Sequence, residues 1–208
     1  MNAAGLLLAA GASSRMGKPK ALLPFGGETV IERGVRNFHA AGIERVVVVL
    51  GCWEKEIRRA CPDLFSGKVV AALNPQPKLG MLSSVQCGLR AAAKLGVEAV
   101  LLALLDQPFV SPLVYRQTLE GCKTKPVSIP QYKGHRGHPI AMSMRLAEEV
   151  LAMNPERQAL RDFVRAEPGR VQRVPVEENA ILRDMDAPAE YHKELRRLQQ
   201  KHGESDAP

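Results

Sequence analysis

Aliphatic runs alternate with amphipathic segments along the first 120 residues of this chain. Four short runs consist almost wholly of aliphatic or small residues, which is typical of strands buried on both faces of a parallel sheet. These strands are predicted at residues 4–10, 45–50, 68–73 and 99–105, and helices at 29–41, 54–61, 83–94 and 111–121. Four successive strand–helix units predict an α/β fold with a mostly parallel sheet and helices on both faces.

The pattern changes after about residue 125. Shorter apolar runs predict strands at 126–130, 140–142 and 170–176, and helices are expected at 146–152, 156–165 and 187–202. A polar loop is expected at 131–138. No repeat or long linker interrupts the chain, so we expect a single domain over residues 1–202 and a disordered tail over 203–208.

The composition narrows the class of protein. A chain of 208 residues, 45% of them hydrophobic and 25% charged, suits one domain with a substantial core. Only 4% of the residues are aromatic, which argues against a nucleic-acid partner, because such proteins often stack bases on aromatic rings. The net charge of +7 fits a protein whose electric field attracts anionic small molecules.

The cysteines and the N-terminal segment bear on the cellular compartment. Cys52, Cys61, Cys87 and Cys122 are scattered without a Cys-x-x-Cys pair, so neither a zinc ribbon nor a disulfide framework is expected. The apolar segment near the N-terminus is short and lacks a basic region, unlike a signal peptide or a membrane span. We therefore expect a cytoplasmic protein with no membrane partner.

Residues 6–20 carry the clearest chemical signal. They read Leu-Leu-Leu-Ala-Ala-Gly-Ala-Ser-Ser-Arg-Met-Gly-Lys-Pro-Lys, in which an apolar strand ends at Gly11 and is followed by Arg15, Lys18 and Lys20. A glycine loop after a strand presents backbone N–H groups at the edge where open α/β sheets bind ligands. Three cations at this loop indicate a polyanion such as a nucleoside triphosphate. An ordinary turn with solvated cations is the alternative.

This loop differs from two common phosphate-binding loops. Five residues separate Gly11 from Gly17, and Pro19 stands where a Walker loop has the hydroxyl that holds Mg²⁺. Ser13 and Ser14 break the dinucleotide pattern Gly-x-Gly-x-x-Gly. The loop can therefore cradle phosphate, but a metal ion must be held by other residues.

Carboxylates later in the chain are candidates for that metal site. Asp106 directly follows the aliphatic run Leu-Leu-Ala-Leu-Leu, which predicts it at the same sheet edge as Gly11. A Mg²⁺–triphosphate needs one or two protein carboxylates besides the phosphate oxygens. Asp184 and Asp186 are candidates for the second carboxylate. For Asp186, capping of the last predicted helix is an equally open interpretation.

Two further segments supply candidate binding groups. Gly80 to Ser84 opens the third predicted helix, where N–H groups and hydroxyls can bind a base or a phosphate, although a simple serine cap is the alternative. Residues 134–139, Gly-His-Arg-Gly-His-Pro, combine Arg136 with two histidines. Because no third ligand has suitable spacing, recognition of an acceptor phosphate is favoured over a transition metal, with a structural turn as the alternative.

Taken in order, these motifs resemble a known family through nearly the whole chain. The residues Leu8-Ala9-Ala10-Gly11, Ser13, Arg15-Met16-Gly17 and Pro19-Lys20 resemble the signature of the sugar-nucleotide and molybdenum-cofactor nucleotidyltransferases. Within them, Gly80-Met81 with Ser83-Ser84, Leu105-Asp106-Gln107-Pro108, the 134–139 loop and Asp184-Met-Asp186-Ala-Pro188 are similar to the cytidylyltransferase group of the MobA/MocA-like NTP transferases. Ala9-Ala10-Gly11 resembles the cytidylyl type rather than the Ala-Gly-Gly of guanylyl relatives, whereas Ala187 departs from the threonine frequent before the family's proline.

The resemblance implies a Rossmann-like three-layer α/β/α nucleotidyltransferase fold and the Mg²⁺-dependent transfer of CMP from CTP to molybdopterin, with release of pyrophosphate. It implies catalytic roles for Arg15, Lys20 and Asp106, and metal binding by Asp106 and Asp186. The nucleotide contacts that it implies are Leu8, Ala9, Ala10, Gly11, Ser13, Arg15, Lys20, Gly80, Ser83, Ser84 and Asp106, and the acceptor contacts are Arg136, Gly137 and His138. A recipient molybdoenzyme is a further expected partner.

The sequence leaves other functions open. The same chemistry with GTP or another nucleotide, or with a different phosphorylated acceptor, is one alternative. A non-catalytic carrier that binds the cofactor is a second, and a nucleic-acid binder is the least favoured. Because an acceptor phosphate is already ionised and no nucleophile–base pair is evident, we expect direct attack on the α-phosphorus without a covalent enzyme intermediate.

Overall fold

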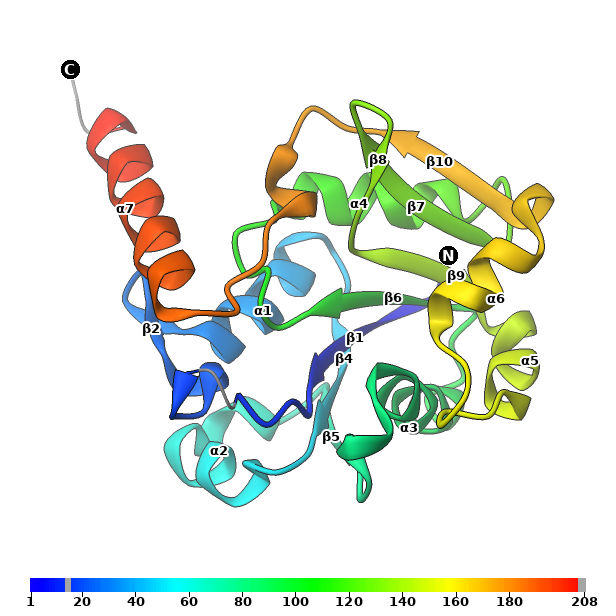
Figure 1. The fold of residues 1–208 in the computed structure, drawn as a ribbon, viewed down its shortest axis with the longest axis horizontal. Helices are drawn as coiled ribbons and strands as arrows, with labels where there is room; N and C mark the ends of the chain where they lie inside the picture. Colours follow the sequence, from blue (N-terminus) through cyan, green and yellow to red (C-terminus); the bar gives the residue numbers. More distant parts are fainter. Residues whose placement is uncertain (14–15, 206–208) are drawn as a thin grey trace.

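In the computed structural model, which describes residues 1–13 and 16–205, one sheet runs through the molecule in the strand order β10-β7-β9-β6-β1-β4-β5, with β8 paired to β7. The strands are β1 (Ala3–Ala9), β4 (Arg45–Leu50), β5 (Val69–Leu73), β6 (Ala99–Leu104), β7 (Val127–Tyr132), β8 (His135–Arg136), β9 (Ile140–Ser143) and β10 (Val171–Pro175). Helices cover both faces of this sheet (Figure 1), which confirms the predicted Rossmann-like α/β fold.

The centre of the sheet is the parallel part that the sequence predicts. β1 pairs in parallel with β4 on one side and with β6 on the other, and β5 extends the sheet beyond β4. Leu6 of β1 lies opposite Val47 and Leu102, and all three side chains are buried. Towards the other edge, β9 lies between β6 and β7 and runs antiparallel to both. Hydrophobic runs predict that a strand exists but not its direction, so this reversal emerges only from the structure.

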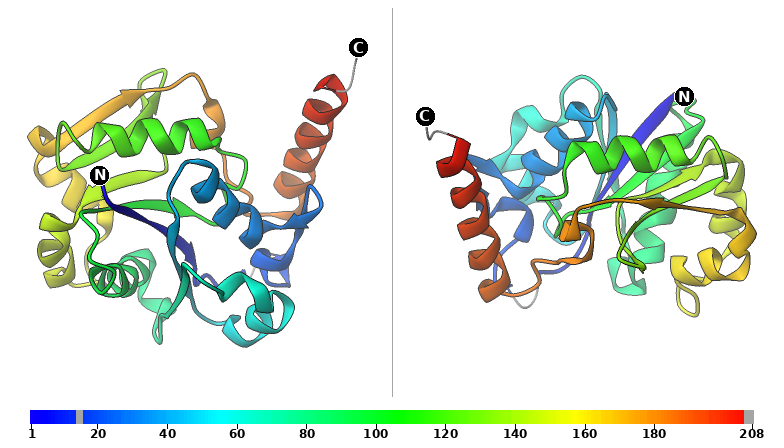
Figure 2. Two further views of the ribbon diagram at one scale, coloured as in Figure 1. Left: turned by 180° about the vertical axis from the view of Figure 1, so that it is seen from behind. Right: turned by 90° about the horizontal axis from the view of Figure 1, so that it is seen from above.

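Two hydrophobic clusters, one on each face, fix the helices against the sheet. α1 (Val30–Ala40), α2 (Glu54–Ala60) and α4 (Pro112–Gly121) contribute to one cluster, and α3 (Met81–Ala93), α5 (Ala147–Ala152) and α6 (Leu160–Ala166) to the other. Figure 2 shows the same two helical layers from behind and from above. α1 begins with a capping box between Thr29 and Glu32, and Ser111 caps α4, as their residue types favour.

A small hairpin and the last helix form a third, separate cluster. The hairpin strands are β2 (Pro24–Phe25) and β3 (Glu28–Thr29), and the helix is α7 (Pro188–Ser205). Phe25 and Tyr191 pack together there with Met185, and the Tyr191 hydroxyl donates to the Pro24 carbonyl over 2.7 Å. Strands of two residues are too short for a periodic pattern, so the sequence analysis did not predict this hairpin.

Two other elements differ from their predicted bounds. α6 begins at Leu160, four residues later than predicted, because the Asn154 and Gln158 side chains bond nearby backbone N–H groups and form a turn instead. β7 continues to Tyr132 and turns into β8, so part of the predicted 131–138 loop is a hairpin. The remaining short helices are 3₁₀ turns at Lys20–Leu22, Pro62–Phe65, Pro77–Leu79, Met144–Leu146, Pro168–Arg170 and Asn179–Leu182.

The C-terminal helix extends further than predicted. α7 continues to Ser205, three residues beyond the predicted helix 187–202. Elongation of an existing helix adds one backbone hydrogen bond for each residue that it orders, which favours this continuation. Residues 206–208 lie outside the described part of the chain.

The structure also bears on whether a helix can span a membrane and on the state of the cysteines. In the part of the chain that the structure describes, no helix is long and apolar enough to cross a bilayer. The four cysteines are free thiols, of which Cys52 is exposed and Cys61 and Cys122 are buried.

Candidate active site

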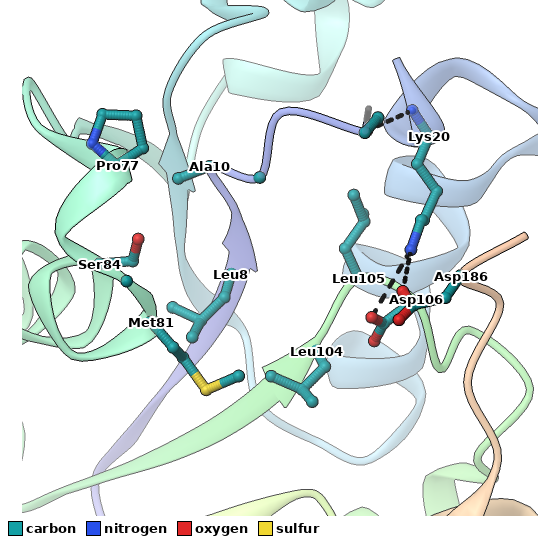
Figure 3. A pocket seen from close by; sticks show the side chains of 13 residues that line it. Leu8, Ala10, Lys20, Pro77, Met81, Ser84, Leu104, Leu105, Asp106 and Asp186 are labelled. Atoms are coloured by element: carbon teal, nitrogen blue, oxygen red, sulfur yellow. Dashed lines mark hydrogen bonds and ion pairs between the residues drawn. The ribbon is translucent and has the colours of Figure 1, made fainter. Parts of the chain in front are cut away.

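A cavity of about 310 Å³ opens where β1 and β6 end. Its walls come from the loop after β1, the start of α3, the end of β6 and the segment before α7 (Figure 3). The lining residues are Leu8, Ala10, Gly11, Ser13, Lys20, Pro77, Gly80, Met81, Ser84, Leu104, Leu105, Asp106 and Asp186. Four segments far apart in the sequence thus meet at the carboxyl edge of the parallel strands, where sheets of this kind bind ligands.

The Lys20 side chain points towards two carboxylates in this cavity (Figure 3). Its ammonium nitrogen lies 2.9 Å from Asp186 Oδ1 and 3.6 Å from Asp106 Oδ2. Lys20 is only 9% exposed, and a lysine is rarely so buried without a charged partner. The structure therefore places a cation and two anions together at one wall of the cavity.

Asp106 is the more deeply placed of the two carboxylates. Its Oδ1 atom is buried and has no hydrogen-bond partner among the described residues. Burial is the main cause that raises the Asp106 pKa to about 6, against the attraction of Lys20, while the charges of Asp184 and Asp186 raise it further. The Met185 N–H donates to the Asp106 carbonyl over 3.0 Å, which ties the two carboxylate segments together.

These two carboxylates fit a hard divalent cation. Mg²⁺ and similar ions prefer carboxylate oxygens, and the unpartnered Oδ1 of Asp106 is such a ligand. Over residues 1–13 and 16–205, no group of three or more His, Cys, Asp or Glu side chains is arranged to hold a metal. A cation held by Asp106 and Asp186 would therefore complete its shell with phosphate oxygens and water, as Mg²⁺ does in nucleotide sites.

The start of α7 bears on the alternative interpretation of Asp186. The Glu190 carboxylate accepts hydrogen bonds from the backbone N–H groups of Ala187 and Asp186, over 2.8 and 2.7 Å. Glu190 thus satisfies donors at the start of this helix. The Asp186 carboxylate accepts from Lys20, so its position suits a role in the cavity.

The loop after β1 turns sharply to bring Lys20 back over the cavity. Ser13 has a positive φ of 52°, and its hydroxyl accepts a hydrogen bond from the Lys20 backbone N–H over 3.0 Å. Gly17 also has a positive φ of 66°, which glycine adopts without strain. Ser14 and Arg15 lie outside the described residues, so the predicted catalytic Arg15 has no structural account.

Two residues that the sequence analysis did not single out support this loop. The Trp53 indole N–H donates to the Ala12 carbonyl over 2.9 Å. A Cβ on Gly51 would lie 2.5 Å from the Ala10 carbonyl oxygen, so only glycine allows the end of β4 to approach this backbone. Neither residue belongs to a recognisable chemical motif, so the sequence alone did not indicate a role for them at this loop.

A buried asparagine organises the turn into α3. Asn74 is 2% exposed, and its Nδ2 atom donates to the hydroxyls of Ser83 and Ser84 over 2.9 and 3.0 Å. The Asn74 Oδ1 atom accepts from the Gln76 N–H over 2.9 Å. The Ser83 hydroxyl in turn donates to the carbonyl of Gly80, a glycine with a φ of 89°. This network holds Gly80 and Ser84 at the wall of the cavity, and Asn74 carried no signal in the sequence.

Most of the predicted nucleotide contacts line this one cavity. Those that do are Leu8, Ala10, Gly11, Ser13, Lys20, Gly80, Ser84 and Asp106. Two expected contacts do not line it. Ala9 is 5% exposed within the core, because alternate residues of a strand face opposite sides, and Ser83 turns inward to Asn74.

A second cavity of about 370 Å³ adjoins the first, and Met81 lines both. It lies between β7, β8, β9 and α6, and it contains the three predicted acceptor residues. Its lining is Met81, Ile129, Arg136, Gly137, His138, Ile140, Ala159, Leu160, Arg161, Val164 and Arg165. The sequence analysis did not predict Arg161 and Arg165, since two arginines on a helix usually form a solvated face.

Gly137 and His138 are fixed by the segment that leads to the carboxylates. A Cβ on Gly137 would lie 2.0 Å from the Ile181 carbonyl oxygen, and the His138 N–H donates to the same oxygen over 3.4 Å. Burial lowers the pKa of His138 to about 4, although the charge of Asp184 opposes this shift. The imidazole is therefore neutral at pH 7.

Comparison with known proteins identifies relatives that match between about half and nearly all of the chain. The family model described as MobA-like NTP transferase domain matches residues 5–173. The chain is 30% identical over 190 residues to nicotine blue oxidoreductase of Paenarthrobacter nicotinovorans, covering 88% of this chain and 91% of that protein. It is 24% identical to molybdenum cofactor cytidylyltransferase of Escherichia coli, covering 89% and 92%. It is also 33% identical to a probable molybdenum cofactor guanylyltransferase of Opitutus terrae, covering 58% and 55%.

Solved structures share the fold over nearly the full chain. A nucleotidyl transferase from Methanothermobacter thermautotroptrophicus superposes with a TM-score of 0.78 at 25% identity, covering 96% of this chain and 99% of that one. Rv0371c from Mycobacterium tuberculosis superposes with a TM-score of 0.80 at 24% identity, covering 94% and 99%. A second structure of that mycobacterial protein is described as a complex with manganese.

Proposed function

This chain belongs to the MobA-like NTP transferase family and is an enzyme of the nucleotidyltransferase type, and on this premise we propose that it transfers CMP from CTP to molybdopterin. Pyrophosphate is the second product. The observation that carries the proposal is the buried Lys20 ammonium between Asp106 and Asp186 at the wall of a cavity that the glycine loop also lines. This arrangement suits a triphosphate with its metal ion.

We propose that the first cavity holds the nucleotide. The loop after β1 and the start of α3 both line this cavity. The dipole and free backbone N–H groups of a helix N-terminus favour an anion. Lys20 and Arg15 are assigned to the triphosphate. Asp106 and Asp186 would hold Mg²⁺, which supplies positive charge against the phosphate oxygens and the departing pyrophosphate.

The chemistry requires the repulsion between two anions to be overcome. Each pair of unit charges 4 Å apart costs about 4 kcal/mol at an effective dielectric constant of 20. The Lys20 ammonium, held in place before the nucleotide binds, offsets part of this repulsion without reorganisation. A phosphate oxygen of the acceptor forms the new bond to the α-phosphorus, and the bond from that phosphorus to the bridging oxygen breaks. Pyrophosphate leaves with the electron pair of that bond.

The second cavity is assigned to the acceptor. Met81 lies between the two cavities, so a phosphate at this residue can face the nucleotide. Arg136 supplies a cation, Gly137 allows the close backbone approach to Ile181, and His138 supplies a neutral imidazole. The product would then pass to a recipient molybdoenzyme.

The choice of CTP over GTP rests on the first loop. Relatives named cytidylyltransferase and guanylyltransferase both match this chain, so their names do not decide between the nucleotides. Ala10 stands where guanylyl relatives usually have glycine, and the methyl group it adds to the cavity wall narrows the space for a base. A smaller pyrimidine suits this wall better than a purine.

The test is pyrophosphate release from purified protein with molybdopterin, Mg²⁺ and one nucleotide at a time, followed by direct competition of CTP with GTP. Release with CTP, and preference for CTP in competition, is the expected result. Preference for GTP would overturn the assigned nucleotide but keep the reaction. No release with any nucleoside triphosphate would overturn the proposed reaction.

The relative from Paenarthrobacter nicotinovorans is named an oxidoreductase, so the test also includes an assay for oxidoreductase activity. The buried Lys20 beside two carboxylates suits a metal-bound triphosphate, which is the substrate of nucleotidyl transfer. We therefore expect no oxidation of NADH or NADPH with nicotine blue at a rate comparable to nucleotidyl transfer. Rapid oxidation together with absent pyrophosphate release would favour the oxidoreductase function.

A further inference from the structure

A third cavity of about 710 Å³ lies between α1, α7 and the loop that leads from β6 into α4. Its walls come from β2, α1, residues 108–112, the segment 179–183 and the second half of α7. Figure 1 shows α7 and the β2–β3 hairpin at the end of the molecule away from α5 and α6. None of the described residues that line this cavity lines either of the two cavities assigned above. The volume is sufficient for a small organic ligand.

The walls of this cavity carry more positive than negative charge. Arg33, Arg183 and Arg197 line it, and Glu194 is the one acidic residue among its described lining. Glu194 is 4% exposed, and its carboxylate pairs with Arg183 over 3.0 Å and also with Arg197. Arg33 pairs with Glu28, which lies outside the lining. Two guanidinium groups thus share one buried carboxylate, and the lining has an excess of two positive charges.

One donor of Arg183 has no acceptor. Its Nε atom is buried and has no hydrogen-bond partner among the described residues. Burial lowers the pKa of Arg183, the charges of Glu194 and Glu178 oppose this shift, and the charge of Arg197 adds to it. The Glu178 carboxylate already accepts hydrogen bonds from the hydroxyl and the backbone N–H of Ser111. A further anion in the cavity would therefore stabilise both Arg183 and Arg197.

The ligand that fits these walls best is a phosphate monoester with an apolar body. Such an ester carries up to about two negative charges near pH 7, which matches the excess charge of the lining. Guanidinium groups bind phosphate oxygens with two parallel hydrogen bonds. The Arg183 guanidinium carbon lies 4.7 Å from the centre of the Phe109 ring, a contact that restricts its orientation. Val110 and Leu198 add apolar wall that can cover a hydrocarbon group.

The segment that carries Asp186 lies in the chain between the two arginines. Asp186 is three residues after Arg183, and α7, which carries Arg197, begins two residues after Asp186. The hydrogen bond from the Met185 N–H to the Asp106 carbonyl joins this segment to the other carboxylate of the first cavity. A ligand that bridges Arg183 and Arg197 therefore restricts the segment at both ends.

We propose that the third cavity is a regulatory site for a small organic phosphate monoester, held by Arg183 and Arg197. Its occupancy strengthens the binding of Mg²⁺ with CTP in the first cavity, because a restricted Asp186 loses less conformational freedom when the metal binds. The binding site itself is independent of the reaction. The effect on Mg²⁺ rests on the proposed function, which assigns the metal to Asp106 and Asp186.

Calorimetric titration with phenyl phosphate tests the site without turnover. We expect Arg197→Ala to raise the Kd of phenyl phosphate at least tenfold, and Arg197→Lys, which keeps the charge but loses the paired donors, to raise it less. Arg196→Ala is the matched control and should stay within twofold of wild type, because this exposed neighbour on α7 does not line the cavity. Glu194 keeps Arg183 as a partner in both Arg197 variants, and thermal unfolding confirms that each variant is folded.

Further comparisons locate the ligand and define its class. Lys20→Ala and Arg136→Ala each remove a cation from one of the other two cavities, and we expect both to keep the Kd within threefold. Inorganic phosphate lacks the apolar body and benzoate lacks the second charge, so each should bind at least fivefold more weakly. Absent binding to wild type, equal Kd values for Arg197→Ala and Arg196→Ala, or a tenfold loss in Lys20→Ala or Arg136→Ala would overturn the site. Equally tight binding of inorganic phosphate or benzoate would overturn the ligand class.

The regulatory effect is measured by the same titration, because coupling between two binding sites is reciprocal. We expect saturating Mg²⁺ and CTP to lower the Kd of phenyl phosphate at least twofold in wild type and to leave it unchanged in Asp186→Asn. An unchanged Kd in wild type would overturn the regulatory role. If the titrations give the expected results but no pyrophosphate is released with molybdopterin, the proposed function is wrong and this site stands. If pyrophosphate is released but Arg197→Ala binds phenyl phosphate as wild type does, the reaction stands and this site is wrong.

Discussion

At the residue scale, the site depends on Lys20, whose ammonium group is held in position by its ion pairs with two carboxylates. Lys20 is buried beside Asp106 and Asp186, and its own backbone N–H bonds to Ser13, so both ends of the residue are fixed. Lys20 and Asp106 could be predicted from the sequence. A cation that follows a glycine loop and a carboxylate that follows a buried strand are both expected at the same edge of the sheet. Asn74 supports the same cavity but is an isolated polar residue in the sequence, so only the fold reveals its role.

Lys20→Ala is predicted to lower the turnover number about 100-fold or more, the loss typical for a preorganised charge at a reacting centre. The measurement is the steady-state rate of pyrophosphate release at saturating CTP and molybdopterin. Lys18→Ala is the control, because Lys18 is exposed and does not line the cavity. A rate within threefold of wild type for Lys20→Ala would remove this residue from the catalytic machinery.

Gly137→Ala is predicted to weaken acceptor binding and to destabilise the fold. The added Cβ would lie 2.0 Å from the Ile181 carbonyl oxygen, so the backbone must shift. A shift of this kind typically costs about 1–3 kcal/mol. Urea unfolding and the KM for molybdopterin are the measurements. Gly169→Ala is the matched control, since nothing lies near a Cβ at that position, and equal effects of the two substitutions would contradict this explanation.

At the scale of elements, the strands of the parallel part of the sheet were the best predicted from the sequence. β1, β4 and β6 are aliphatic runs because they are buried on both faces, whereas the aliphatic strand β5 lies at the sheet edge with Val70 and Leu73 exposed. The aliphatic pattern predicted the positions of all four strands to within a residue or so. The β2–β3 hairpin and the antiparallel direction of β9 have no such signature, because they depend on tertiary contacts. The proposed acceptor cavity forms between β8, β9 and α6, and for this reason Arg161 and Arg165 of α6 were not predicted, whereas Arg136 was.

Asn74→Ala tests whether the turn into α3 is held by its hydrogen-bond network. The substitution removes a donor to Ser83 and Ser84 and an acceptor for the Gln76 N–H, all in a buried position. We expect a loss of about 1–3 kcal/mol in the free energy of unfolding and a several-fold rise in the KM for CTP. Asn154→Ala is the control, because its side chain supports a turn that does not line the cavity. An unchanged KM for CTP would show that the network does not position the nucleotide.

At the scale of the whole molecule, two hydrophobic clusters on opposite faces of one sheet fix the positions of the two cavities relative to each other. The third cluster attaches α7, and with it Asp186, to the hairpin near Lys20. The groups that we propose as catalytic come from distant segments and are thus positioned by packed structure. Sequence patterns predicted helices on both faces of the sheet, but the attachment of α7 through Tyr191 and Pro24 follows from three-dimensional packing alone.

The stability of the fold is predicted to depend on the protonation of His138. Its pKa is about 4 in the folded protein, below the ordinary value of 6.5, because the imidazole is buried despite the nearby Asp184 charge. The neutral ring therefore contributes stability that is fully present above pH 6.5 and is lost as the pH falls towards 4. Wild type should lose on the order of 2 kcal/mol more than His138→Gln between pH 7 and pH 4. Urea unfolding at both pH values measures this, and parallel losses in the two proteins would contradict it.

The central claim is that Asp106 and Asp186 hold the metal ion of a bound nucleotide for transfer. Its most direct test is single-turnover pyrophosphate release at saturating CTP and molybdopterin, measured against Mg²⁺ concentration for wild type, Asp106→Asn and Asp186→Asn. These substitutions keep side-chain size and remove the charge. We predict that each variant loses at least 100-fold in rate at low Mg²⁺ and needs more Mg²⁺ for half its maximal rate. Wild-type rates and an unchanged Mg²⁺ requirement in either variant would contradict the claim.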